Sequence, residues 1–192
     1  ICFFSNRSEY IKATSEKTKG FHDSLGYFSS VHNRIYLFSR KDSLESLRML
    51  EKYDDHRDTA KKKYRGDQLK DYLTALQKEK MKYLEKLRQE TLCTLRHEGT
   101  HQLAHMYGMH SQRGFEKKWL TEGIAQYFET EVPGAARNQK KAILLKSSKQ
   151  NSLFSWEDLV NSDQGTFLNA GSKERQLVYS QSWLIVRFLM KN

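Results

Sequence analysis

The stretch Arg96-His97-Glu98-Gly99-Thr100-His101-Gln102 decides how this chain is organised. It contains the pattern H-E-x-x-H, two histidines four positions apart with a glutamate directly after the first. On a helix, residues four apart lie one turn apart on the same face, so His97 and His101 can direct two imidazoles at one ion. Glu98 lies beside that face, where its carboxylate can take a proton from a metal-activated water. The pattern predicts a helix that carries a metal site for hydrolysis.

A third ligand is expected from a different element, because a catalytic zinc ion usually takes three protein ligands and keeps one position for water. Glu122 is the strongest candidate. It lies in the stretch Trp119-Leu120-Thr121-Glu122-Gly123-Ile124-Ala125-Gln126-Tyr127-Phe128-Glu129, with twenty residues between His101 and itself. That spacing leaves room for one loop and an antiparallel return, which would bring a second helix beside the first.

His105 is the rival ligand, eight residues after His97 and therefore about 80° further around a helix of 3.6 residues per turn. The metzincin pattern H-E-x-x-H-x-x-G-x-x-H would need Gly and His where the chain has Ala104 and Tyr107. We therefore expect His105 beside the site or at the surface. Four other histidines have no spacing argument and are expected to be ordinary surface or loop residues: His22, His32, His56 and His110.

The composition is that of a folded but highly charged protein. With 192 residues, 38% hydrophobic and 29% charged, the chain is long enough to bury a core and too apolar for a disordered chain. Its formal charge of +10 would attract anions. Basic residues are mixed with acidic ones, however, and no recognition motif accompanies them, so we expect no specific nucleic-acid binding. We interpret the two dense basic runs as solvated helix faces: Lys61-Lys62-Lys63 with Arg65, and Lys140-Lys141.

The cysteines and the apolar runs argue against a disulfide-stabilised protein and against a membrane-spanning one. Cys2 and Cys93 give no disulfide framework, and the helical apolar spacing around Cys93 predicts a core residue. No apolar run reaches the roughly 20 residues that span a membrane, so no transmembrane segment is expected. The chain opens at Ile1 without an initiator Met, and we expect it to be a fragment or processed form of a longer chain. Compartment and oligomeric state stay open.

The first part of the chain, residues 1–40, is expected to form a small antiparallel or mixed sheet around a short helix at residues 8–14. Its strands are the apolar runs at residues 1–4, 27–28 and 34–38, the last of them as an edge strand able to hold an extended peptide. His32-Asn33 would suit a turn between strands.

Residues 42–95 are expected to be charged helices that lead to the motif helix. Ser43 is a plausible N-cap, and the polar stretch 54–66 is expected to separate the first helix from the next. Nothing between residues 67 and 96 breaks a helix, so one helix over residues 67–107 is possible. A helix of that length is unusual, and we therefore expect a break or kink. Gly108 would end it as the C′ residue. Its apolar side would consist of Leu92, Leu95, Leu103 and Met106.

The last part of the chain, residues 96–192, is expected to be the metal-binding and C-terminal helical region of a single domain spanning residues 1–192. Ser155 with Asp158 has the spacing of an N-cap and its third position. Helices are expected after the motif helix at residues 117–130, 135–149, 155–160 and 172–190.

Taken together, the two motifs resemble the gluzincin metallopeptidases, the clan of thermolysin and the zinc aminopeptidases. H-E-x-x-H, followed about twenty residues later by W-L-x-E-G-x-A-x-Y-F-E, is the specific part of the likeness. A strand at residues 33–38 and a late helix around Tyr179-Ser180-Gln181-Ser182-Trp183-Leu184 extend it over most of residues 25–190. The closest likeness is to an uncharacterised bacterial family of that clan, known only as a domain of unknown function.

This resemblance implies an α+β, zincin-like fold, with a small sheet packed on a mainly helical bundle around the motif helix. It implies Zn²⁺ held by His97, His101 and Glu122, with Glu98 as the general base that hydrolyses a peptide or protein substrate. The exopeptidase motif G-x-M-E-N is absent. Aminopeptidase action is therefore in doubt, while endopeptidase or amidase action and the cleavage preference stay open.

Tyr179 has two readings. The aminopeptidase-like gluzincins use a tyrosine well downstream of the third ligand to stabilise the oxyanion, and Tyr179 lies in a similar place, 57 residues after Glu122. Tyrosine is also common in cores, where its ring packs and its hydroxyl is bonded. In that reading Tyr179 packs beside Leu177, Val178 and Trp183.

Two other functions are weighed against hydrolysis. One is a zinc-binding interaction module without activity, although the presence of Glu98 gives no sign of inactivation. The other is a basic protein that binds nucleic acid or an anionic surface, which would show a steep salt dependence.

Overall fold

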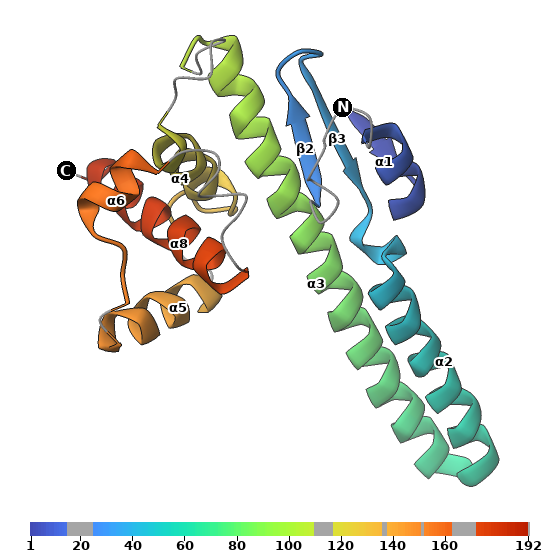
Figure 1. The fold of residues 1–192 in the computed structure, drawn as a ribbon. Coiled ribbons are helices and arrows are strands. Elements are labelled where there is room, and N and C mark those ends of the chain that lie inside the picture. The colour runs from blue at the N-terminus through green and yellow to red at the C-terminus, as the bar shows by residue number, and fades with distance from the viewer. Residues whose placement is uncertain (15–24, 110–116, 136–137, 151, 163–171, 192) are drawn as a thin grey trace. The chain divides into compact units, whose positions relative to one another are not determined.

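The computed structural model describes residues 1–14, 25–109, 117–135, 138–150, 152–162 and 172–191 (Figure 1). The chain divides into two compact units, one of Ile1–Leu25 with Tyr36–Leu92 and one of Gly26–Ile35 with Cys93–Asn192. Helices dominate both units, and a small three-stranded mixed sheet completes an α+β protein, as predicted. The prediction of a single domain over residues 1–192 stays a prediction. Among the residues described, no helix is both long and apolar enough to cross a membrane.

The elements follow in this order along the chain: β1 (Cys2–Phe4), α1 (Arg7–Thr14), β2 (Gly26–Ser29), β3 (Arg34–Phe38), the 3₁₀ helix η1 (Arg40–Asp42), α2 (Leu44–Lys63), α3 (Gly66–Met106), α4 (Lys118–Phe128), α5 (Asn138–Lys149), α6 (Trp156–Asn161) and α8 (Ser172–Leu189). The three predicted strands and the predicted helices are therefore present, with bounds that shift by a few residues.

The sheet has the order β1-β3-β2, so β3 is its central strand. β1 pairs with β3 in parallel, with Phe3 opposite Leu37. The prediction that residues 34–38 form an edge strand is wrong. The physical reason is that strands pair on both sides of β3, so neither of its edges is left open; its four side chains from Ile35 to Phe38 are also buried. In the described sheet, β2 lies at one end of this order and β1 at the other.

The first unit has an aromatic core where α1 meets the strands. Tyr10 is buried, and its ring lies 6.1 Å from Phe4 and 5.2 Å from Phe38 between centroids. In Figure 1 the helices α2 and α3 of this unit form a long antiparallel hairpin. Ser43 caps α2 as predicted, since its hydroxyl accepts a hydrogen bond from the Ser46 N–H.

The polar stretch 54–66, predicted to separate two helices, is instead helical as far as Lys63. Contacts across the hairpin favour the helix: Lys80 Nζ lies 2.9 Å from Asp54 Oδ1, and the Tyr53 and Tyr83 rings lie 6.2 Å apart. Only residues 64 and 65 separate α2 from α3. The predicted exposure of Lys61, Lys62 and Lys63 is confirmed, while the side chains of Lys140 and Lys141 lie outside the described part.

Helix α3 runs through 41 residues without interruption, so the predicted break is wrong. The stretch lacks proline, and its many Leu, Lys, Glu and Gln residues are good helix formers. It ends as predicted at Gly108, which has φ +71°. The Gly108 N–H donates to the His105 carbonyl and the Met109 N–H to the Ala104 carbonyl. This pair of hydrogen bonds defines a Schellman motif.

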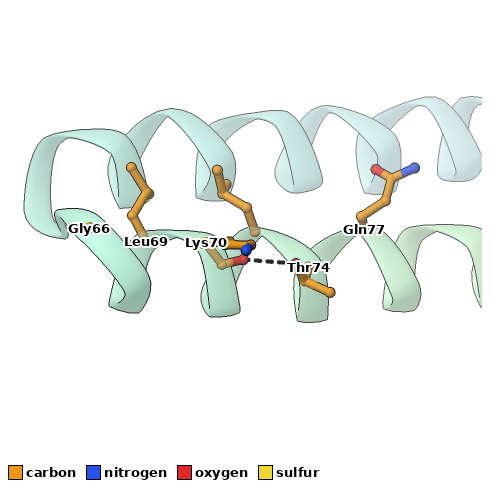
Figure 2. Close-up of a pocket in the computed structure, with 6 residues that line it drawn as sticks. Gly66, Leu69, Lys70, Thr74 and Gln77 are labelled. Atoms are coloured by element: carbon orange, nitrogen blue, oxygen red, sulfur yellow. Dashed lines mark hydrogen bonds between the residues drawn. The ribbon is translucent and has the colours of Figure 1, made fainter.

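A shallow hollow of about 550 Å³ lies on the opening turns of α3. Figure 2 shows its residues along the helix, with the Thr74 hydroxyl donating to the Lys70 carbonyl. The lining side chains bring one charged group, Lys70, and no cluster of acids, histidines or cysteines. The hollow is lined by Gly66, Leu69, Lys70, Leu73, Thr74 and Gln77.

In the second unit, the buried face of α3 differs from the predicted one. Leu103 and Met106 are 56% and 62% exposed, while Ala104 is buried. His97, His101 and Ala104 are spaced by four and three residues, so they occupy the inward face, while Leu103 and Met106 face the solvent. The predicted apolar side is therefore wrong at Leu103 and Met106.

Helix α4 packs on α8, and α5 also packs on α8. Their core consists of buried residues from α4, α6 and α8: Trp119, Leu159, Val178 and Val186. Gly123 of α4 makes this contact close. A Cβ at that position would lie 2.7 Å from the Ser182 carbonyl oxygen and 2.6 Å from Val186 Cγ2. The small size of Gly123 therefore lets α4 and α8 approach closely. Separately, α6 starts at the predicted Ser155 cap.

Candidate metal centre

The two histidines of the motif face one another on α3. His97 Nε2 lies 3.2 Å from His101 Nε2, and the two rings are nearly perpendicular, at 81°. Their side chains are 16% and 14% exposed, so both imidazoles are largely removed from water. The four-residue spacing on a helix therefore produces the predicted pair of nitrogens.

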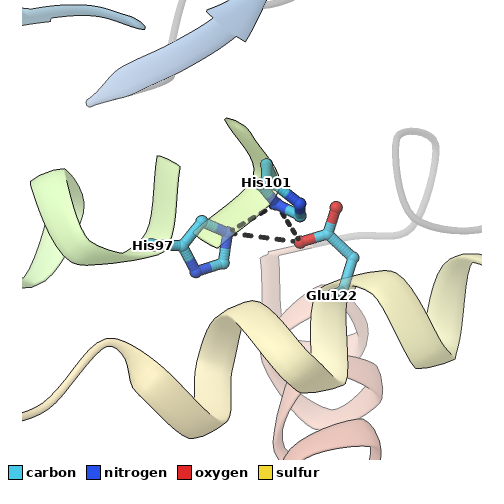
Figure 3. Close-up of side chains that lie close together, drawn as sticks. All are labelled: His97, His101 and Glu122. Atoms are coloured by element: carbon cyan, nitrogen blue, oxygen red, sulfur yellow. Dashed lines mark hydrogen bonds and ion pairs between the residues drawn. The ribbon is translucent and has the colours of Figure 1, made fainter. Parts of the chain in front are cut away.

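Glu122 enters this pair from α4. Its Oε2 lies 3.3 Å from His97 Nε2 and 3.5 Å from His101 Nε2. In Figure 3 all three side chains point toward one another, the histidines from α3 and the glutamate from α4. The ligand atoms of the three residues lie within 4.8 Å of one another, so they form a buried group that could hold one metal ion. Two imidazole nitrogens and a carboxylate oxygen match a common zinc donor set.

The charges of this group are strongly coupled. Burial by itself lowers the pKa of His97, but hydrogen bonds to Glu122 and Glu129, together with the Glu98 charge, raise it to about 10. For Glu122, burial raises the pKa, while the His101 charge and the hydrogen bonds from both histidines bring it well below its usual range. Without metal, the group is therefore held by an ion pair between a protonated histidine and a carboxylate.

Glu98, the predicted general base, is partly buried and lies outside this group of three. Its Oε2 accepts a 2.9 Å hydrogen bond from the backbone N–H of Phe28 in β2. The carboxylate is thus oriented by a strand at the end of the sheet order. A backbone donor has no signature in the sequence, and sequence reasoning did not find Phe28.

Tyr179 combines features of both its predicted readings. Its side chain packs against the hydrophobic core cluster of Trp119, Leu159, Val178 and Val186. Burial raises the pKa of its phenol above the usual value of 10, and the negative charges of Glu122 and Glu98 raise it further. The hydroxyl therefore keeps its proton at neutral pH, as a hydrogen-bond donor must. Its role as an oxyanion donor stays a prediction.

Of the other histidines that the structure describes, none joins the metal-ligating group. His105 is partly buried, and its ring lies 5.6 Å from the Phe28 ring, which agrees with a position beside the site. His32 and His56 are exposed as expected, while His22 and His110 lie outside the described residues. Cys93, predicted to be a core residue, is only partly buried.

Two further charged side chains contact the ligands, and sequence reasoning missed both. Glu129 Oε2 lies 3.7 Å from His97 Nδ1, on the opposite side of the imidazole from Glu122. Lys118 Nζ lies 3.8 Å from Glu122 Oε1. The available signal was helical spacing, because Glu129 follows Glu122 by seven residues, or two turns, and Lys118 precedes it by four.

In a comparison with protein-family models, residues 91–192 match the family described as "Protein of unknown function (DUF1570)". The matched segment contains both motifs and Tyr179. No curated protein and no solved structure matches the chain. The prediction of an uncharacterised domain family is confirmed, and this chain belongs to the DUF1570 family.

Proposed function

We propose that this protein is a zinc-dependent hydrolase of peptide or other amide bonds, with the zincin-like fold and ligand set of the gluzincins. One observation carries the proposal: His97, His101 and Glu122 meet with their ligand atoms within 4.8 Å. These residues come from two helices, and catalytic zinc sites of this kind use two histidines and one glutamate while keeping a position for water.

Zinc held there would act as a Lewis acid that lowers the pKa of water and polarises the carbonyl of the bond to be cleaved. The chain's own residues have separate tasks. His97 and His101 would bind through Nε2 and Glu122 through Oε2, since these are the atoms that face one another. Glu98 takes the proton of the attacking water on its carboxylate and delivers it to the leaving amine.

The Phe28 hydrogen bond supports this role for Glu98 and also suggests where a substrate lies. Because the Phe28 N–H points at Glu98, the outer side of β2 faces the proposed general base. An extended peptide could pair with the backbone groups of this edge that Glu98 does not occupy, with its scissile bond near the metal group. In the proposal, β2 therefore takes the place that the sequence had suggested for β3.

Tyr179 is the proposed donor to the developing oxyanion. The support is that its partly buried side chain packs against the core that includes Trp119 of α4, and that the negative charges of Glu122 and Glu98 help to raise the pKa of its phenol, which therefore keeps its proton. A preorganised donor of this kind contributes about 3 kcal/mol to transition-state stabilisation in other hydrolases. Tyr179→Phe would separate this role from core packing, since it keeps the ring.

The test combines metal content with activity on a mixture of peptides. Glu98→Gln should retain about one zinc per chain and lose hydrolysis, because Gln cannot accept the proton. His101→Ala should lose the metal, whereas the matched control His105→Ala, one turn further along α3, should keep it. The exposed Glu131→Gln controls for loss of a nearby carboxylate.

A wild-type protein that binds no zinc even when supplied with it would contradict the proposal. Zinc binding without any cleavage would instead indicate a zinc-binding interaction module. Binding to nucleic acid or anionic vesicles that falls steeply with salt, and that Glu98→Gln and His101→Ala leave unchanged, would indicate a basic protein that binds nucleic acid or an anionic surface.

A further inference from the structure

Glu129 is a buried acid that the proposed chemistry does not use. It follows the last turn of α4 with helical backbone angles, and only 6% of its side chain is exposed. Removing a carboxylate from water is costly unless it is paired with a cation or bonded by donors. Its position therefore needs an explanation beyond a place on the surface.

The two carboxylates of this segment approach His97 from opposite sides. Glu122 Oε2 lies 3.3 Å from Nε2, and Glu129 Oε2 lies 3.7 Å from Nδ1. Both belong to α4 or its end, and their seven-residue spacing keeps them on one face. One imidazole is thus flanked by a ligand carboxylate and by a second carboxylate that faces the other ring nitrogen.

The turn after α4 helps to hold Glu129 in place. The Gly134 N–H donates to the Tyr127 carbonyl at 2.7 Å, which folds the chain back on the end of the helix. Gly134 has φ +74°, and a Cβ there would lie 2.5 Å from the Tyr127 ring. Glycine permits both the backbone conformation and the close approach, so residues 127–134 form a compact support.

Imidazole chemistry gives this arrangement a consequence. A neutral histidine carries one N–H, and only the other nitrogen can bind a metal. A carboxylate at Nδ1 favours the tautomer with the proton on Nδ1, which leaves the lone pair of Nε2 for an ion. Nε2 is the nitrogen that faces His101 and Glu122.

We propose that Glu129 is a positioning residue for the metal centre: it accepts the Nδ1–H of His97, fixes the tautomer and the ring orientation, and so raises metal affinity. This inference rests on the proposed zinc site, but it concerns a residue that the ligand set does not include. Partners of this kind typically change metal affinity by about 10–100-fold.

The experiment measures the zinc dissociation constant by competition with a chromophoric chelator, for the wild type and three variants. Glu129→Ala should raise Kd by about 10–100-fold. Glu129→Gln should raise it less, because its amide oxygen can still accept a hydrogen bond, and it tests the proposal should the alanine variant not fold. The exposed Glu131→Ala, two residues further on, should leave Kd unchanged.

A second readout separates positioning from a merely structural role. Imidazole ¹⁵N NMR of the zinc-loaded protein should show His97 with a proton on Nδ1 in the wild type and a loss of that single form in Glu129→Ala. If the wild type binds zinc and both Glu129 variants bind it within twofold, the inference is wrong while the proposed function stands. If the wild type binds no zinc, both fall together.

Discussion

The backbone N–H of Phe28 donates a 2.9 Å hydrogen bond to Glu98 Oε2, joining two residues that are 70 positions apart. Phe28 lies in the middle of β2, and Glu98 lies on α3 directly after His97. The bond connects the strand to the residue that we propose as general base. It fixes the direction of the carboxylate without adding a charge, because the donor is a neutral amide.

Removing this donor tests its importance. Phe28→Pro deletes the N–H, and proline is tolerated on edge strands where the N–H points outward. A hydrogen bond to a charged group contributes about 1.5–3 kcal/mol, so kcat/KM for peptide hydrolysis should fall by about 10–100-fold with zinc content unchanged. Phe28→Ala, the control, keeps the N–H and loses the ring contact with His105. Equal rates for the proline and alanine variants would show that the donor is unimportant.

Gly123 predicts a stability effect that depends on packing and not on helix propensity. In Gly123→Ala, the new methyl group would lie 2.7 Å from the Ser182 carbonyl oxygen, so α4 and α8 must move apart. Overpacking of this kind costs about 1–3 kcal/mol, and the displacement of Glu122 should weaken zinc binding.

Gly99→Ala is the matched control for this effect, since no atom lies within 4 Å of a Cβ there. Alanine is a better helix former than glycine by up to about 1 kcal/mol, so this variant should unfold at higher urea concentration than the wild type. If Gly123→Ala behaved in the same way, the close approach of α4 and α8 would be contradicted.

Gln181 predicts a second stability effect, because its side chain pairs with both backbone polar groups of Phe154. Nε2 donates to the Phe154 carbonyl at 3.0 Å, and Oε1 accepts from the Phe154 N–H at 2.9 Å. Gln181→Leu would leave both groups without this partner and should lower the free energy of unfolding by about 1–3 kcal/mol. Gln181→Glu keeps only the acceptor, so its free energy of unfolding should lie between those of the wild type and Gln181→Leu. The exposed Gln176→Leu on the same helix should have little effect in urea unfolding, and an equal loss there would refute the pairing.

The parts of the site that sequence could predict are those that follow from spacing within one helix or between two consecutive helices. His97 and His101 meet because four residues make about one turn, and Glu122 meets them after a single loop. Helix ends are similarly local, since each depends on a side chain or a backbone angle within a few residues. Examples are the N-caps at Ser43 and Ser155 and the helix C-terminus at Gly108.

What the sequence could not predict depends on partners far away in the chain. Strand order is one example: the apolar run at residues 34–38 has the same composition in the centre of a sheet as at its edge. The helical state of residues 54–63 is another, because its support includes Lys80 and Tyr83 from the facing helix. Phe28 was missed for a related reason, as it acts on the motif through a backbone contact that its own neighbours do not indicate.

The raised pKa of His97 predicts how pH affects both stability and zinc binding. In the metal-free protein its folded pKa of about 10 exceeds the ordinary value of 6.5. Its contribution to stability is thus complete below pH 6.5 and is lost as the pH rises toward 10. Urea unfolding of chelator-treated protein at pH 6, 8 and 10 should show this decline.

Zinc must displace the His97 proton, so calorimetry at pH 7.5 in buffers of different protonation enthalpy should report about one proton released per zinc. His105→Ala should release the same number. No proton release, together with a metal-free stability that is constant from pH 6 to 10, would contradict a protonated His97 at the centre of this group.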